Sequence, residues 1–197
     1  MAPPTGSSAG PLGGVILSEA MHGDYDDIAD VMFEAVRSGD SLYSERQRTA
    51  WMPHRRSGDD WEARLDRQTV IVARDASRML GFMSIDPAGY IDFAYIRPEA
   101  QRTGLFRRLF ERIEQHSRAR GDARMWVHAS LMAQPAFAAL GFEVVEHQAV
   151  RIGDESFERA EMEKRRSPGA RNVALDGRTP CQVARSNPNP ARAPQAS

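Results

Sequence analysis

The hydrophobic residues of this 197-residue chain repeat with helical spacing in two long segments. In the first, Asp24 or Asp26 can cap a helix. Its apolar positions are Ile28, Val31, Met32 and Ala35. The second helix is expected from Gly104 to Arg120, where Gly121 ends it. Its apolar stripe consists of Leu105, Phe106, Leu109, Phe110 and Ile113.

Runs of β-branched, aromatic and other apolar residues predict strands between polar turns. The expected strands cover residues 15–17, 69–73, 79–85, 90–96, 125–129, 142–152 and 157–163. The strands at 69–96 follow one another closely enough for antiparallel pairing, and the last two form a hairpin that turns at Gly153-Asp154. Residues 40–67 predict two short helices interrupted by Pro53, and residues 134–140 predict another helix before Gly141. The element order is β-α-α-βββ-α-β-α-ββ.

The two ends of the chain differ in composition from its middle. Residues 1–14 are mostly Pro, Gly and other small residues, which predicts a disordered leader. Residues 167–197 contain several prolines and scattered arginines without periodicity, which predicts a disordered tail. We therefore expect a single folded domain over residues 15–166.

The charge and cysteine content exclude several classes of protein. Twenty-six Lys and Arg stand against 27 Asp and Glu, so the net charge of -1 gives no general attraction to nucleic acid or anionic membrane. The single cysteine, Cys181, cannot form an internal disulfide or a cysteine-based metal site. No apolar run approaches the roughly 20 residues of a membrane helix, and residues 1–14 lack the features of a signal peptide. We expect a cytoplasmic protein with neither nucleic acid nor membrane as a partner.

The segment 90–109 predicts a strand that leads through a turn directly into the second long helix. The first turn of a helix leaves backbone N–H groups unpaired, and together with the helix dipole they can bind a phosphate. Gly104 allows a close approach of the backbone. Arg102, Arg107 and Arg108 at the same helix start would oppose the dipole unless an anion lay between them. The alternative is a solvated basic face.

Two sequence motifs resemble those of the GNAT superfamily of N-acetyltransferases. QRTGLF at residues 101–106 resembles the pyrophosphate motif Gln/Arg-x-x-Gly-x-Gly/Ala, and YIRP at residues 95–98 resembles the strand end before it. ASLMAQPAFAALGF at residues 129–142 resembles the motif A-S-x-N-A-x-x-F-Y-x-x-x-G-F. The resemblance covers about residues 15–164, and the MEK sequence at residues 162–164 is similar to the last strand of small bacterial GNAT proteins.

The resemblance implies an α/β (α+β) fold with a central mixed, mostly antiparallel sheet of about six to seven strands, flanked by about four helices. The central strands would splay apart to admit acetyl-CoA, which serves as co-substrate without a metal. The backbone of Ala94 and Ile96 would pair with pantetheine, and a strand amide near Tyr95 would polarise the thioester carbonyl. The other coenzyme-binding residues implied are Gln101, Arg102, Thr103, Gly104, Leu105, Phe106, Arg107 and Phe137.

A base is needed because an alkyl amine, with a pKa of about 10.4, is mostly protonated at neutral pH. Asp92 stands at about the place where the family often has an acidic residue, and we expect it to act as base or as amine anchor. The alternatives are that Asp92 pairs with a nearby arginine or faces solvent. His128 is a second candidate base, although a histidine in such a strand is more often a structural hydrogen-bonding group.

Three residues depart from the GNAT motifs. Phe106 stands where a second small residue is usual, and Met132 replaces an asparagine that often binds the coenzyme. Phe137 stands where a tyrosine commonly protonates the leaving thiolate, and a phenyl ring has no proton to give. Water can protonate a thiolate, so slow catalysis is compatible with Phe137.

The acceptor site is expected between residues 40–67 and the final hairpin. Tyr43 and Trp51 are the substrate-binding candidates, with Glu45 and Trp61 nearby, and the alternative for these aromatic residues is core packing. The expected function is acetyl transfer to a primary amine of a small molecule or peptide. Two alternatives stay open: a coenzyme-binding sensor without turnover, and an anion- or protein-docking patch. A homodimer formed through the final hairpin is also left open.

Overall fold

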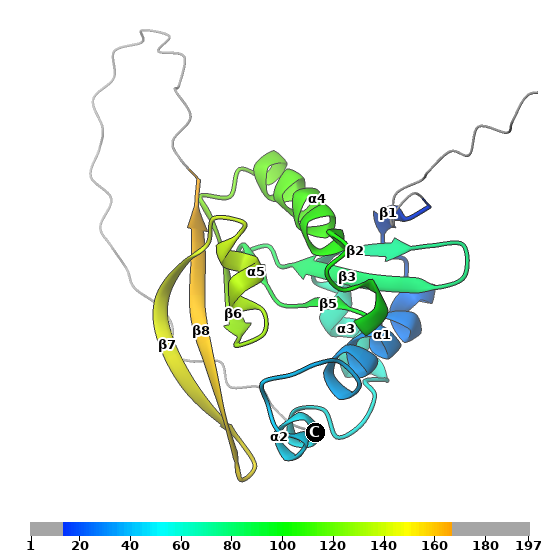
Figure 1. The fold of residues 1–197 in the computed structure, drawn as a ribbon. Coiled ribbons are helices and arrows are strands. Elements are labelled where there is room, and N and C mark those ends of the chain that lie inside the picture. Colours follow the sequence, from blue (N-terminus) through cyan, green and yellow to red (C-terminus); the bar gives the residue numbers. More distant parts are fainter. Residues whose placement is uncertain (1–13, 167–197) are drawn as a thin grey trace, which may run out of the picture. The chain divides into compact units, whose positions relative to one another are not determined.

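The computed structural model describes residues 14–166 of the chain (Figure 1). The leader and the tail that the sequence predicts to be disordered lie outside the described residues, apart from Gly14. Within residues 14–166, no helix has the length and apolar character needed to cross a membrane.

Helices and strands follow the expected order β-α-α-βββ-α-β-α-ββ with two differences: three α-helices precede the second strand, and four strands lie between the third and fourth α-helices. The helices are η1 (His22–Asp24), α1 (Tyr25–Arg37), α2 (Glu45–Trp51), α3 (Asp59–Asp66), η2 (Pro98–Ala100), α4 (Leu105–Arg120) and α5 (Gln134–Ala138), where η denotes a short 3₁₀ helix. The strands are β1 (Ile16–Glu19), β2 (Thr69–Arg74), β3 (Met79–Ile85), β4 (Tyr90–Ile91), β5 (Ala94–Ile96), β6 (Arg124–Ser130), β7 (Glu143–Ile152) and β8 (Glu155–Arg165).

The strands form two four-stranded sheets. The first has the order β1-β2-β3-β5 and is antiparallel throughout. The second has the order β4-β6-β8-β7, in which β4 and β6 are parallel and the other pairs antiparallel. The predicted mixed, mostly antiparallel fold is confirmed, with eight strands and five α-helices within residues 14–166 where about six to seven and about four were expected.

The prediction of one continuous strand over residues 90–96 is wrong. This segment divides at Asp92-Phe93 into β4, which pairs with β6, and β5, which pairs with β3. The Oγ of Ser84 accepts a hydrogen bond from the Phe93 backbone N–H at 3.1 Å, in the place of a strand carbonyl. Residues 90–96 therefore connect the two sheets, and the sheets separate where the segment divides.

Helices cover both faces of the first sheet (Figure 1). Helix α4 packs on one face through the predicted stripe, in which Leu109, Phe110 and Ile113 are buried. Helices α1 and α3 cover the opposite face through residues such as Ile28 and Leu65. Burying each such side chain contributes about 1.5–3 kcal/mol, and the two apolar clusters hold β2, β3 and β5 firmly between the helices.

Candidate functional site

Strands β5 and β6 diverge from each other, and we call the gap between them the fork. The parallel pairing of β4 with β6 ends at Ile91 and Val127, but β6 continues to Ser130 and the other strand continues as β5 to Ile96. Between residues 14 and 166, no strand pairs with the side of β5 that faces away from β3. The splayed central strands implied by the resemblance are thus present.

Alternation along β5 determines which backbone groups line the fork. The Arg97 N–H donates to the Leu80 carbonyl at 2.8 Å, and the Ser84 N–H donates to the Phe93 carbonyl at 2.9 Å. Since every second residue of a strand points its N–H and C=O to the same neighbour, Tyr95 also faces β3, and Ala94 and Ile96 face the fork. The Ile96 carbonyl accepts a hydrogen bond of 3.3 Å from Gln101 Nε2.

The turn before α4 has an unusual backbone. Gly104 is the N-cap residue with a φ of 89°, and two residues earlier Arg102 also has a positive φ, 61°. A left-handed non-glycine residue is uncommon and marks a constrained backbone. A Cβ added to Gly104 would meet no atom within 4 Å, so open space lies in front of the helix start.

The side chains of this turn contact other residues of the protein. Thr103 Oγ1 donates to the Ala100 carbonyl at 2.7 Å. Arg102 lies 3.6 Å from Asp40, and both side chains are exposed. Leu105 is buried in the core. With no acidic residue in its first turn, α4 keeps the positive end of its dipole uncompensated.

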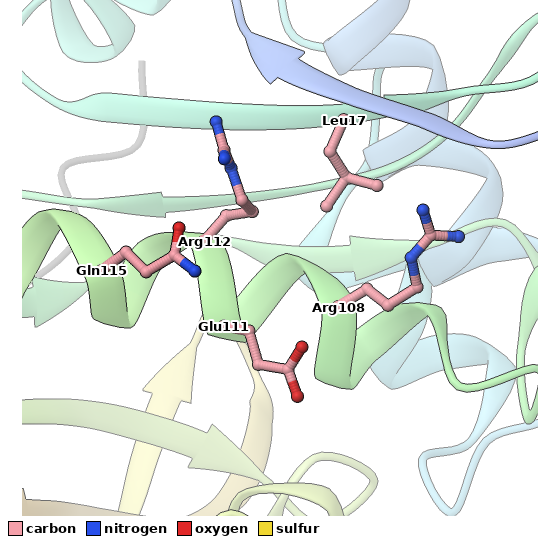
Figure 2. A pocket seen from close by; sticks show the side chains of 5 residues that line it. All are labelled: Leu17, Arg108, Glu111, Arg112 and Gln115. Carbon is pink, nitrogen blue, oxygen red and sulfur yellow. The ribbon is translucent and has the colours of Figure 1, made fainter.

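The arginine cluster expected at the start of α4 is dispersed. Arg107 reaches the Ala139 carbonyl at 3.4 Å, and Arg108 donates to the Val15 carbonyl at 2.9 Å. Figure 2 shows Arg108 in a groove between β1 and α4. The residues lining this groove are Leu17, Arg108, Glu111, Arg112 and Gln115. The groove runs along α4 instead of lying at the fork, so Arg108 belongs to a different surface.

The two phenylalanines that depart from the GNAT motifs contact each other. Phe106 and Phe137 pack edge to face with ring centroids 5.2 Å apart, and Phe137 packs in the same way on Phe142 at 5.1 Å. Phe137 is fully buried, and Phe106 packs against the same core. Phe106 thus turns into the core and does not cover the helix start. The sulfur of Met132 accepts a hydrogen bond from the Leu42 N–H.

Asp92 lies where the fork begins, between β4 and β5, and forms an ion pair with Arg64. Arg64 donates to both Asp92 oxygens, at 2.8 and 2.7 Å, and Gln68 Nε2 donates to Oδ2 at 2.7 Å. The Asp92 side chain is only 9% exposed. From the sequence, an ion pair with a nearby arginine is one alternative to a role for Asp92 as the base. This ion pair is present.

Tyr95 lies beside this pair on the face covered by α1 and α3. Its ring contacts Phe82 and Phe93, with centroids 5.8 and 6.5 Å away. Burial raises the pKa of the Tyr95 phenol to about 12, so the hydroxyl keeps its proton at neutral pH. Its backbone faces β3, which leaves Ala94 and Ile96 as the nearest amides able to donate into the fork.

His128 belongs to an aromatic group on β4 and β6. Tyr90 lies over Trp126 with centroids 4.4 Å apart, and the Tyr90 hydroxyl lies 3.3 Å from His128 Nδ1. The other ring nitrogen, Nε2, is 3.7 Å from Glu161. Burial, followed by the positive charge of Arg159, lowers the pKa of His128 to about 4. His128 is therefore an uncharged imidazole at neutral pH.

This lowered pKa predicts a pH-dependent stability. Because the folded-state pKa of about 4 lies below the ordinary value of about 6.5, the unfolded chain binds more protons between these values and stability falls as the pH drops. From pH 7.5 to 4.5 the wild type should lose about 1 to 3 kcal/mol more than His128→Asn. Urea unfolding of both proteins at each pH measures the difference. Parallel losses would contradict a neutral His128.

The substrate-binding candidates Tyr43 and Trp51 both pack edge to face on Phe157 of β8, at centroid distances of 5.5 and 5.3 Å. The Tyr43 hydroxyl donates to the Glu158 carbonyl at 2.6 Å and accepts from the Leu131 N–H at 3.1 Å. These contacts join residues 40–51 to the ends of β6 and β8. They form one wall beside the fork.

Trp61 and Glu45 are separate from this wall. Trp61 is buried against Phe93, with its indole N–H donating to the Tyr25 carbonyl at 3.2 Å, so core packing is confirmed for it. Glu45 is exposed in the first turn of α2. Among residues 14–166, no group of three or more His, Cys, Asp or Glu side chains is arranged to hold a metal ion.

Several polar side chains near the fork are not predicted from the sequence. Arg64 and Gln68 hold Asp92 from the end of α3, and no pattern in the sequence connects them with residue 92. Arg159 and Glu161 lie beside Ser130 and His128 in the β6–β8 register. Along β8, polar residues alternate with the buried Phe157, Ala160 and Met162. This alternation is a sequence signal that Arg159 and Glu161 face away from the core, although the three-residue step from Phe157 to Ala160 weakens the signal.

Comparisons with known proteins agree with this architecture. The family profile described as "Acetyltransferase (GNAT) domain" matches residues 40–164. The N-acetyltransferase YafP of Escherichia coli K12 is 29% identical over 129 residues, which is 65% of this chain and 81% of YafP.

Two solved structures have the same fold. A GCN5-related N-acetyltransferase of Rhodopseudomonas palustris superposes with a TM-score of 0.72 at 25% identity, over 77% of this chain and 96% of that one. The PaiA N-acetyltransferase of Thermoplasma acidophilum, solved with coenzyme A, has a TM-score of 0.61 at 16% identity, over 77% and 99% of the two chains. With the family profile matching well over half of the sequence, the chain belongs to the GNAT acetyltransferase family.

Proposed function

We propose that this protein transfers an acetyl group from acetyl-CoA to a primary amine of a small molecule or peptide. The observation that carries the proposal is the fork, where the edge of β5 that has no partner strand within residues 14–166 leads directly to the open helix start at Gly104. An extended chain with amide groups can bind along such an edge, and a pyrophosphate can bind at such a helix start. The coenzyme A in the PaiA structure supports the same ligand class for this chain.

The residues present fit acetyl-CoA. Ala94 and Ile96 present backbone groups to the fork, as pantetheine binding requires. The N–H groups of Leu105, Phe106 and Arg107 begin α4 and are available to a phosphate. Phe106 leaves the helix start open because its ring packs on Phe137. Gln101 and Thr103 fix the shape of the turn through backbone carbonyls.

Acetyl-CoA supplies the acetyl group as a thioester, so the amine nitrogen forms the new bond to the carbonyl carbon while the carbon–sulfur bond breaks and the sulfur takes up a proton. The backbone N–H of Ala94 or Ile96 stabilises negative charge on the carbonyl oxygen. Asp92 accepts the proton of the amine, directly or through a water, and Arg64 orients its carboxylate. Tyr43 and Trp51 contribute to the wall against which the amine lies.

Replacing Asp92 by Asn should lower kcat roughly tenfold or more while leaving acetyl-CoA binding unchanged, because the amide keeps the shape of the carboxyl but cannot take a proton. Steady-state thiol release and calorimetry measure the two quantities. The matched control is Arg64→Gln, which breaks the same ion pair and keeps the carboxylate. Equal losses of kcat in both variants would mean that the ion pair is structural and that Asp92 is not the base.

A second function is favoured by one observation. Phe137 lies in the core with no hydroxyl to protonate a thiolate, which suits a protein that binds acetyl-CoA on the same fold and turns it over slowly or not at all. Such a protein would act as a sensor or bind a partner.

Calorimetric titration with acetyl-CoA and with CoA, followed by thiol release with a panel of amines, separates these functions. We expect micromolar binding with amine-dependent thiol release. Binding without release would favour the sensor. No binding would contradict both functions.

A further inference from the structure

Arg159 is a half-buried arginine on the sheet face beside the fork. In β8, Ala160 and Met162 point into the core beneath α4 and α5. Arg159 and Glu161 lie on the opposite face, and their partners in the β6 register are Ser130 and His128. Arg159 therefore shares a face with the aromatic group of Tyr90, Trp126 and His128.

A chain of side-chain hydrogen bonds fixes the Arg159 guanidinium. Its Nε donates to Gln148 Oε1 at 3.0 Å, and Gln148 Nε2 donates to Glu146 Oε2 at 2.9 Å. Among residues 14–166, the terminal nitrogens Nη1 and Nη2 have no hydrogen-bond acceptor and no carboxylate within 4 Å. Two parallel donors of a planar guanidinium match the two oxygens of a carboxylate.

Within residues 14–166, no carboxylate contacts the Arg159 guanidinium directly, and Glu146 reaches it only through Gln148. The positive charge of Arg159 acts to lower the pKa values of Tyr43, Tyr90 and His128. Burial is the first cause that raises the pKa of both tyrosines, so they keep their protons at neutral pH, and His128 is uncharged there as well. Glu161 lies nearer to His128 than to Arg159. Asp92, the other acid at the fork, is already paired with Arg64.

We propose that Arg159 binds a carboxylate of the acceptor, so that the acceptor is a small amine carrying a carboxylate, such as an amino acid. This inference rests on the proposed acetyl transfer and names the substrate class for the same site. The carboxylate would occupy the free end of the guanidinium, and the amine would extend past His128 toward Ala94. A fixed cation in this position also disfavours polyamines and other purely cationic acceptors.

The test compares free acids with amides. Acetyl-CoA-dependent thiol release is measured for the standard amino acids that carry a primary amine and for their carboxamides, in which a neutral amide replaces the carboxylate. The best acid should exceed its amide about tenfold or more in kcat/KM. Arg159→Gln should remove this preference mainly through KM, while binding acetyl-CoA normally. Arg151→Gln, an exposed arginine on the same hairpin, is the matched control and should retain the preference.

A binding measurement makes the test independent of turnover. With CoA present, calorimetry compares the N-acetylated acid and the N-acetylated amide of the same amino acid, and the wild type should bind the acid about tenfold more tightly. Two outcomes would overturn this inference and leave the proposed acetyl transfer standing. One is a wild type that binds acetyl-CoA normally but binds acid and amide equally well. The other is an Arg159→Gln variant that keeps the preference for the acid. A wild type that does not bind acetyl-CoA would overturn the proposed function and this inference together.

Discussion

Gly104→Glu should weaken acetyl-CoA binding by at least about 100-fold. The substitution places a carboxylate in the open space before α4, where we propose that the pyrophosphate binds. The negative charges of the carboxylate and the pyrophosphate would then lie close together and repel each other. The φ of 89° adds backbone strain of about 1 kcal/mol for any residue with a Cβ. Calorimetric titration of the purified variant with acetyl-CoA measures the loss.

The structure provides a matched control for this variant. Gly121, at the other end of α4, has a φ of 86° and likewise no atom within 4 Å of an added Cβ. Gly121→Glu therefore carries the same backbone strain and the same added charge far from the fork, and should bind acetyl-CoA as the wild type does. If Gly104→Glu bound normally, or if both variants lost binding equally, the turn before α4 would not be the phosphate site.

Phe137→Ala should lower the free energy of unfolding by about 3–5 kcal/mol, since it removes a fully buried ring between Phe106 and Phe142. The loss combines the transfer free energy of the ring with the cost of the cavity left between Phe106 and Phe142. Urea unfolding monitored by circular dichroism measures it.

Met132→Ala is the control from the same motif. The Met132 side chain is 42% exposed, and its replacement should cost less than about 1 kcal/mol. The contrast separates two reasons for departing from the family motif, because Phe137 is part of the core whereas Met132 contacts the Leu42 backbone at the surface. A small loss for Phe137→Ala would mean that the ring is not core and is free to take part in coenzyme binding.

The sequence by itself determined most of the element order and the turn before α4. The stripe of Leu105, Leu109 and Ile113 has the helical period, and glycines mark both ends of that helix, so local rules were sufficient. The two GNAT motifs predicted the fold class in the same way. All of these signals lie within short stretches of sequence, where backbone preference and side-chain spacing act directly.

Only the tertiary structure decided which residues meet at the fork. Residues 90–96 look like one strand in the sequence, but Ile91 pairs with β6 and Ala94 with β3, because two sheets compete for the same segment. Asp92 meets Arg64 from 28 positions away, and Arg159 comes to lie beside His128 through the β6–β8 pairing. Pairing between distant segments depends on the packing of the whole chain. The residues that such pairing brings together therefore carry no periodic signal in the sequence.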